Sequence, residues 1–218
     1  MKITYLGHSA FQLILANGTR IVFDPYTAGA FGGGLGVGPI TGDFDVAVVS
    51  HDHEDHTSRD VLKRSKHVVA KAGRVDVAGV AVESVATFHD EAKGAKRGKN
   101  LVSVVEAEGL RVAHFGDLGH AVGSKDHPML VGLDVIMIPV GGFFTIDAGT
   151  AAKIAKDLQP KIVIPMHYKT EKNDFPITPV ENFTKLMDNV ENVGASEIEV
   201  TKGTLPVKMK VVVLQPAN

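Results

Sequence analysis

The sequence predicts an α/β (α+β) fold in which a β-sandwich is flanked by outer helices. Two strand-rich stretches, residues 11–23 and 80–115, each contain an apolar hairpin, and strands alternate with helices beyond residue 135. Two packed sheets whose outer faces are covered by helices accommodate this order of elements. No linker or low-complexity segment divides the chain, so we expect one domain over residues 1–218.

The first hairpin joins the strands predicted at residues 11–15 and 20–23. Its turn carries Asn17-Gly18, a strong hairpin signal because both residues tolerate a positive φ. A second hairpin, with strands at 102–105 and 110–113, has Glu-Gly at its turn. The two hairpins align at one constant spacing, which suggests two similar halves; the matched pairs are Gly18 with Gly109, Arg20 with Arg111, and Ile21 with Val112.

The remaining elements follow from apolar periodicity and capping residues. Val46 to Val49 reads as a short buried strand, and Thr57 or Ser58 can cap a short helix that runs to Arg64. The last third predicts, in order, a strand at 135–139, a helix at 147–158, a strand at 162–164, a helix at 178–187 opened by Thr-Pro, and a strand at about 207–214.

Composition narrows the possible function. The chain has no cysteine, which excludes disulfides, thiolate metal ligands and a cysteine nucleophile. The net charge of −2 gives no general reason to expect nucleic acid as a partner. No apolar segment approaches the length of a membrane span, so we expect a cytoplasmic protein with no membrane partner. We expect its substrate to be a small molecule. The oligomeric state is left open, and a homo-oligomer is possible.

The strongest chemical signal is the run His51-x-His53-x-Asp55-His56, which directly follows the strand at 46–49. Residues two apart in an extended segment project to one side, so His51 and His53 can reach one metal ion. Asp55 and His56 lie past the bend and can face a second one. Imidazole and carboxylate ligands suit zinc, and also iron or manganese.

This run resembles the signature of the metallo-β-lactamase superfamily, and other family elements follow in order. They are Asp24 in Val-Phe-Asp, His89 in Thr-Phe-His-Asp, Asp117 in Phe-Gly-Asp-Leu-Gly-His120, and His167 in Ile-Pro-Met-His-Tyr. Tyr-Leu-Gly-His8-Ser and Pro139-Val-Gly-Gly-Phe-Phe-Thr-Ile-Asp147 are similar to a branch of zinc-dependent hydrolases related to sugar-phosphate lactonases. The resemblance spans nearly the whole chain and implies a four-layer αββα sandwich.

Carried over residue by residue, the resemblance implies a site for two divalent metal ions. One ion would lie on His51, His53 and His89, the second on Asp55, His56 and His167, with Asp117 bridging both. Zinc is the expected metal, with manganese or iron as alternatives. Ligands in loops at strand ends fit a rigid open site, and Asp24 is expected to orient one of the ligands.

The implied activity is hydrolysis of an ester, lactone or phosphodiester bond by a hydroxide held between the metals. Asp55 and Asp117 can take up or return a proton, and Asp55, His120 or water can protonate the leaving group. Two alternatives stay open: a phosphodiesterase or nuclease acting on nucleic acid, and a non-hydrolytic di-iron redox or sensory protein.

Two residues are candidates for substrate binding. His8 could line the pocket, and Arg97 belongs to a basic run after His89 that could bind an anionic substrate. A solvated turn is the alternative interpretation of this basic run, which comprises Lys93, Lys96, Arg97 and Lys99.

Overall fold

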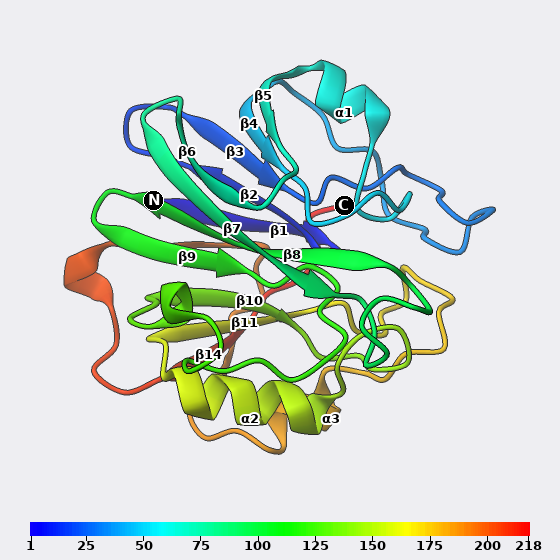
Figure 1. Ribbon diagram of the computed structural model, residues 1–218, viewed down its shortest axis with the longest axis vertical. Helices are drawn as coiled ribbons and strands as arrows, with labels where there is room; N and C mark the ends of the chain where they lie inside the picture. Colours follow the sequence, from blue (N-terminus) through cyan, green and yellow to red (C-terminus); the bar gives the residue numbers. More distant parts are fainter.

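The computed structural model describes residues 1–218 and contains two β-sheets packed face to face, with helices outside them (Figure 1). The first sheet has six strands in the order β13-β1-β2-β3-β4-β5. Their bounds are β1 Lys2–Gly7, β2 Ala10–Ile14, β3 Arg20–Phe23, β4 Phe44–Val48, β5 Ser65–Val69 and β13 Glu197–Glu199.

The second sheet has eight strands in the order β12-β14-β11-β10-β9-β8-β7-β6. Its centre is parallel, because β9, β10, β11 and β14 run in one direction, whereas β6 to β9 form an antiparallel meander. The bounds are β6 Gly73–Val77, β7 Val80–Phe88, β8 Lys99–Ala107, β9 Leu110–His114, β10 Val135–Pro139, β11 Ile162–Met166, β12 Val190–Asn192 and β14 Lys210–Val213.

Helices complete the four layers of an αββα sandwich, as the sequence predicted (Figure 1). Helix α1, Arg59–Lys63, covers the six-stranded sheet, while α2, Ala148–Leu158, and the short α3, Glu181–Thr184, cover the eight-stranded sheet. Ser58, one of the two predicted caps, accepts the Val61 N–H. Asp147, which the sequence placed inside the next helix, is its cap and accepts the Thr150 N–H. None of these helices has the length and the apolar character needed to span a membrane.

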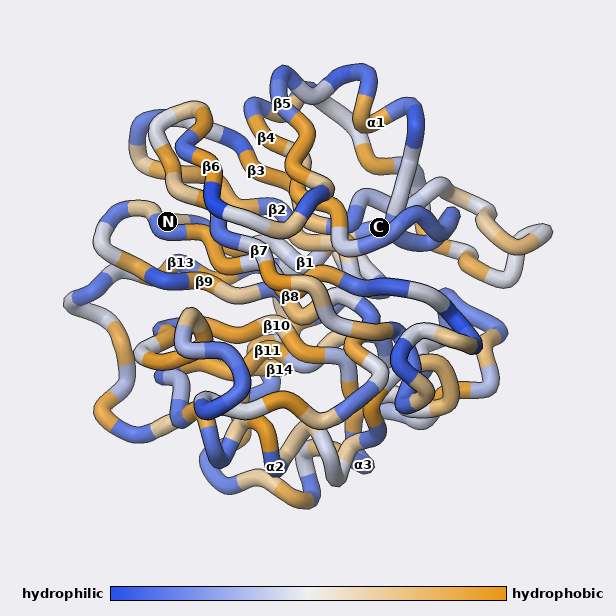
Figure 2. The backbone as a smooth tube through the Cα atoms, in the orientation of Figure 1, coloured by the Kyte–Doolittle hydropathy of each residue, from blue (hydrophilic) through white to orange (hydrophobic).

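The core follows the hydropathy of the strands. Apolar strands fill the space between the sheets and beneath α2, and polar residues gather in the connecting loops (Figure 2). All five residues of β10 and of β11 are buried, as expected for strands covered on both faces. A smaller apolar cluster, which includes Val61 of α1, covers the outer face of the six-stranded sheet.

The two halves suggested by the hairpins are present in the structure. In each half a hairpin is followed by a parallel strand: β2-β3 by β4, and β8-β9 by β10. The aligned arginines make the same contact, because the Arg20 N–H donates to Asp45 Oδ2 and the Arg111 N–H donates to Asp134 Oδ2, both at 2.8 Å. The repeat is thus structural as well as sequential.

One predicted helix is much shorter than the sequence indicated. In place of a helix over 178–187, only Glu181–Thr184 is α-helical. The Thr178 N–H and Oγ1–H both donate to the Gly141 carbonyl, so Thr178-Pro179 is extended rather than a helix cap. The last strand also begins late, at Lys210 instead of 207.

Candidate metal centre

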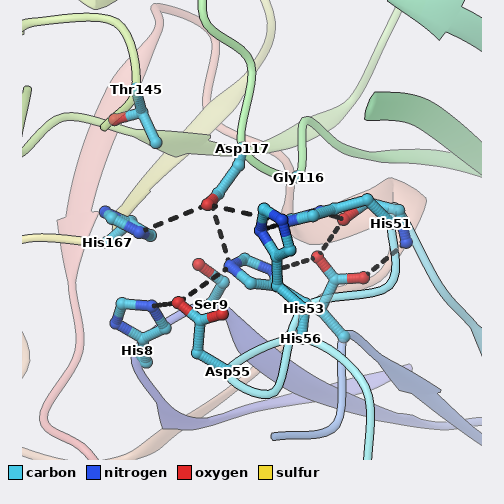
Figure 3. Close-up of polar contacts among 12 residues, drawn as sticks. His8, Ser9, His51, His53, Asp55, His56, Gly116, Asp117, Thr145 and His167 are labelled. Atoms are coloured by element: carbon cyan, nitrogen blue, oxygen red, sulfur yellow. Dashed lines mark hydrogen bonds and ion pairs between the residues drawn. The ribbon is translucent and has the colours of Figure 1, made fainter. Parts of the chain in front are cut away.

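The predicted metal-binding residues lie together at one rim of the sandwich, in the loops that follow strand ends. Asp24 follows β3, the histidine run follows β4, and His89 follows β7. Asp117 follows β9, and His167 follows β11. Strands that run parallel deliver their carboxyl ends to the same edge, which explains how segments far apart in sequence meet. Figure 3 shows the resulting cluster.

Three histidines form the first group. Ring nitrogens of His51, His53 and His89 all lie within 4.8 Å of one another, and His51 Nε2 is 2.9 Å from His53 Nδ1. His89 is buried, whereas His53 is exposed to solvent. Three imidazoles that converge with one open side are the donor set of a catalytic metal site.

A second group lies beside the first. Donor atoms of Asp55, His56, His167 and His8 also lie within 4.8 Å of one another, and all four residues are buried. His56 Nε2 is 3.6 Å from Asp55 Oδ2. The structure therefore adds His8 to the three residues that the sequence placed around this position.

The Asp117 carboxylate lies between the two groups (Figure 3). Its Oδ2 is 3.1 Å from His89 Nε2 and 3.5 Å from His167 Nε2, while its Oδ1 is 3.1 Å from His56 Nε2. One carboxylate thus reaches ligand atoms of both groups. This is the position required of a bridging ligand.

Asp24 fixes the orientation of two histidines. Its Oδ2 accepts from His56 Nδ1 at 2.7 Å and from the Ser50 hydroxyl at 2.6 Å. Since that hydroxyl donates to Asp24, it accepts the Nδ1 proton of His51, 2.8 Å away. With Nδ1 of both rings turned toward these partners, Nε2 of His51 and of His56 faces the other residues of the cluster, where it could ligate a metal ion.

Buried polar atoms with few or no partners indicate whether the histidine and aspartate cluster could hold a cation. Asp55 Oδ1 is buried without a partner, and His56 Nε2 and Asp117 Oδ1 are buried and have only each other, 3.1 Å apart. Buried acceptors without a donor are rare in folded proteins and call for an ion or water. Nitrogen and carboxylate donors in this arrangement are ligands that zinc, iron and manganese accept. The residues therefore fit a metal centre.

The electrostatics of the group also favour positive charge. Burial alone would lower the pKa of His56, but the carboxylates of Asp117, Asp55 and Asp24 raise it well above its usual value. Burial raises the pKa of Asp117, yet its histidine neighbours hold it well below the ordinary range. Three carboxylates kept ionised around one point create a negative potential that would stabilise a bound cation.

A strained turn presents Asp117. Gly116 has a φ of +53°, and a Cβ there would lie 2.3 Å from Asn100 Oδ1 and 2.5 Å from Ser50 Cβ. Asn100, fully buried, accepts the Asp117 N–H at 2.9 Å and donates to the Phe115 carbonyl. Only glycine fits this position, and the hydrogen bonds of Asn100 fix the backbone that carries the Asp117 carboxylate.

The cluster opens into a cavity of about 470 Å³. Besides the candidate ligand residues, the lining includes two cations of the basic run and three aromatic rings, and sequence reasoning had assigned none of these rings to a site. The lining residues are Phe31, His53, Asp55, His89, Lys96, Arg97, Asp117, Phe144, His167 and Phe175.

Arg97 lines this cavity as predicted, held there by Asp90. The Asp90 carboxylate accepts four backbone N–H groups, from Ala92 and Gly94 at Oδ1 and from Lys96 and Arg97 at Oδ2, at 2.7 to 2.9 Å. Burial raises the pKa of Asp90, but these donors outweigh that effect and lower it below 3.8. The basic run is therefore an ordered loop around one carboxylate. Asp90 was not foreseen, although its place directly after His89 in a glycine-containing loop was a usable signal.

Two predicted roles need correction. His120 does not join the cluster: its Nε2 accepts the Phe88 N–H, and its Nδ1 donates to the Ala121 carbonyl, so neither nitrogen is free to protonate a leaving group. His8 is buried behind Asp55 and does not line the cavity. Its Nε2 lies 3.1 Å from Asp55 Oδ2, so it contacts a ligand residue rather than substrate.

The fold and the site define a metallo-β-lactamase-type sandwich with a histidine and aspartate metal centre. The model of the beta-lactamase superfamily domain matches residues 2–167, and the chain belongs to this superfamily. A UPF0173 metal-dependent hydrolase from Korarchaeum cryptofilum is 31% identical over 200 residues, which cover 81% of this chain and 85% of that protein.

Solved structures agree with this assignment. A Thermotoga maritima protein, described as a candidate zinc-dependent hydrolase of the metallo-β-lactamase superfamily, superposes with a TM-score of 0.79 at 36% identity and covers 98% of this chain and 97% of its own. A metallo hydrolase from Ignicoccus hospitalis is 24% identical, with a TM-score of 0.68 over 100% of this chain and 96% of its own, and shows the shared fold alone.

Proposed function

We propose that this protein is a binuclear metal-dependent hydrolase that cleaves an ester, lactone or phosphodiester bond in a small anionic substrate. The observation that carries the proposal is the Asp117 carboxylate, whose two oxygens reach donor atoms of both histidine groups. The relatives named metal-dependent or zinc-dependent hydrolases support the reaction class.

Two divalent ions would be held by the two groups, with zinc as the first choice and manganese or iron as alternatives. His51, His53 and His89 would hold one ion, and Asp55, His56 and His167 the other, with Asp117 between them. When bound, such ions lower the pKa of water toward about 7 and polarise a carbonyl or phosphoryl oxygen.

The chain's own residues supply orientation and proton transfer. Asp55 and Asp117 line the cavity; Asp55 Oδ1 has no partner and could take up a proton beside the reacting bond, whereas Asp117 Oδ1 faces His56 Nε2 at 3.1 Å. Arg97 is half-buried at the same cavity and can pair with an anionic group bidentately, and Lys96 can add a point charge.

The test is a hydrolase screen on protein reconstituted with zinc, manganese or iron, over esters, lactones and phosphodiesters. Metal analysis should find about two equivalents per chain, and a chelator should abolish turnover. His53→Ala should lose most activity, whereas His67→Ala, an exposed histidine of β5, should not. Failure to bind metal, or equal activity in His53→Ala and the parent, contradicts the proposal.

The same screen separates the two alternatives. Single-stranded RNA and DNA are included as substrates, and cleavage of these alone would identify a nuclease. A stable iron content with a visible absorption band and no turnover of any ester would identify a di-iron redox or sensory protein.

A further inference from the structure

We infer that the cavity selects substrates in which an apolar acyl or aryl group adjoins the anionic group, and that three phenylalanines recognise the apolar part. This inference rests on the proposed function and narrows its substrate class. It follows from the composition of the cavity wall, part of which is formed by Phe31, Phe144 and Phe175.

The three rings converge from loops far apart in the sequence. Phe31 lies in the glycine-rich loop before β4, Phe144 follows β10, and Phe175 follows β11. Phe175 is central: its ring centroid is 5.8 Å from that of Phe31 and 6.1 Å from that of Phe144, both in edge-to-face geometry. Such contacts stabilise a continuous aromatic surface.

Much of this wall lies outside the core, although Phe175 also packs against the smaller apolar cluster. Phe31 is 54% exposed, and Phe144 and Phe175 are only half-buried, so much of the three rings faces water rather than core. Apolar surface gathered at a concave site is typical of ligand recognition, because a bound apolar group would remove it from water.

The wall is continuous with the cationic loop. The guanidinium of Arg97 lies 5.6 Å from the centroid of the Phe144 ring, and Lys96 lines the same cavity. A ligand that fills about 470 Å³ therefore meets metal-binding residues, phenyl rings and two cations together. The chemistry that satisfies all three surfaces is an amphipathic anion, such as an acyl or aryl ester that carries a carboxylate or phosphate.

Binding of non-hydrolysable anions tests the inference without relying on turnover. Methylphosphonate and phenylphosphonate carry the same anionic group and differ in the apolar part. On zinc-loaded protein, calorimetric titration should give about ten-fold tighter binding of phenylphosphonate. Phe175→Ala and, separately, Phe31→Ala should reduce this preference to about two-fold, while Arg97→Ala should weaken both ligands alike.

Val131→Ala is the control, because Val131 is 55% exposed, about as exposed as Phe31, and does not line the cavity. It should keep the preference, and circular dichroism should show that all variants fold. Equal affinities in the parent protein, or an undiminished preference in Phe175→Ala and Phe31→Ala, would overturn the inference. If the preference holds but no ester, lactone or phosphodiester is hydrolysed, the proposed function fails and the aromatic recognition stands.

Discussion

His8 and His167 hold each other in left-handed backbone conformations at the rim of the metal centre. Their φ angles are 54° and 51°, the His167 N–H donates to the His8 carbonyl at 2.9 Å, and their ring centroids lie 4.2 Å apart. Such conformations cost non-glycine residues about 1–3 kcal/mol each and persist where the surroundings enforce them. The contact ties the β1–β2 turn of one sheet to the end of β11 in the other.

His8 also fixes Asp55. Burial, followed by the nearby His167, lowers the pKa of His8 to about 4, so the ring is neutral at ordinary pH. A neutral ring can donate its Nε2 proton to Asp55 Oδ2, 3.1 Å away, which leaves Asp55 Oδ1 as the unpartnered oxygen. His8 therefore acts as a positioning residue for two members of the second group, Asp55 by its side chain and His167 by its carbonyl.

The first prediction concerns His8→Asn, which tolerates a positive φ but cannot reach Asp55 as the imidazole does. Affinity for the second metal equivalent should fall by about 10- to 100-fold. Affinity for the first equivalent should change little, because the substitution does not touch His51, His53 or His89. Zinc titration against a chromophoric chelator measures both constants. His67→Asn is the control, and an unchanged second equivalent in His8→Asn would show that His8 does not position Asp55.

The second prediction concerns Asp117→Asn, which replaces a charged bridging carboxylate by a neutral amide. Two dications would then repel each other with less compensation, so the second equivalent should bind at least about 10-fold more weakly and activity should fall by more than about 100-fold. Titration and turnover are measured on the same sample. Asp52→Asn is a matched control, because Asp52 is exposed and pairs with Arg59 outside the cluster. Retained affinity in Asp117→Asn would exclude bridging.

The third prediction concerns Asp90→Asn. An amide can accept N–H groups at one oxygen only, so its NH₂ would face two of the four backbone donors that Asp90 now accepts. The loop should loosen, and backbone amides of residues 92–97 should exchange hydrogen faster by mass spectrometry. KM for an anionic ester should rise several-fold with little change in kcat, because Lys96 and Arg97 lose their fixed position.

The pH dependence of this variant has a defined sign. Because the folded protein lowers the pKa of Asp90 below 3.8, its contribution to stability is present above that pH and is lost as pH falls through the lowered value. The difference in Tm between parent and Asp90→Asn should therefore stay constant from about pH 7 to pH 5 and shrink below 3.8. A difference that stays constant down to about pH 2.5 would contradict this role.

Local signals predicted the parts of the fold that depend on local chemistry. Asn17-Gly18 marked a real hairpin, and Ser58 is one of the two caps that the sequence indicated. The histidine run and the aspartates could be placed together from the resemblance to the metallo-β-lactamase superfamily, and their positions after predicted strands agreed with it. The helix expected from Thr178 failed because a tertiary contact with Gly141, distant in sequence, overrides the local cap.

The walls of the site could not be predicted in this way. Phe31, Phe144 and Phe175 share no periodicity or motif, and they meet only because three loops fold over the same rim. His8 was identified from its motif, but its burial behind Asp55 depends on the His167 contact, which no sequence pattern shows. Metal ligands are fixed by strand ends, whereas substrate contacts are fixed by loop packing.

The last prediction concerns Arg97. It compares a basic residue of the loop that lines the cavity with one that does not. Arg97 is half-buried and lines the cavity, whereas Lys93 is exposed and lines neither this cavity nor the neighbouring hollow that contains Lys71 and Lys99. Arg97→Ala should raise KM for an anionic substrate about 10-fold, with a much smaller effect on a neutral analogue of the same size. Because a half-exposed charge is screened over about 10 Å at 0.1 M salt, added salt should narrow the gap between parent and variant.

Steady-state kinetics on paired anionic and neutral esters, each at about 0.05 and 0.5 M salt, measure the effect. Lys93→Ala removes the same kind of charge from the same loop, and its KM values should match those of the parent for both esters. Arg97→Lys should recover only part of the loss, because an ammonium keeps the charge but cannot bind a carboxylate or phosphate through two parallel N–H groups. Two results would contradict a role of the loop in substrate binding and favour a solvated turn instead. They are equal KM changes for charged and neutral substrates in Arg97→Ala, and equal effects of Arg97→Ala and Lys93→Ala.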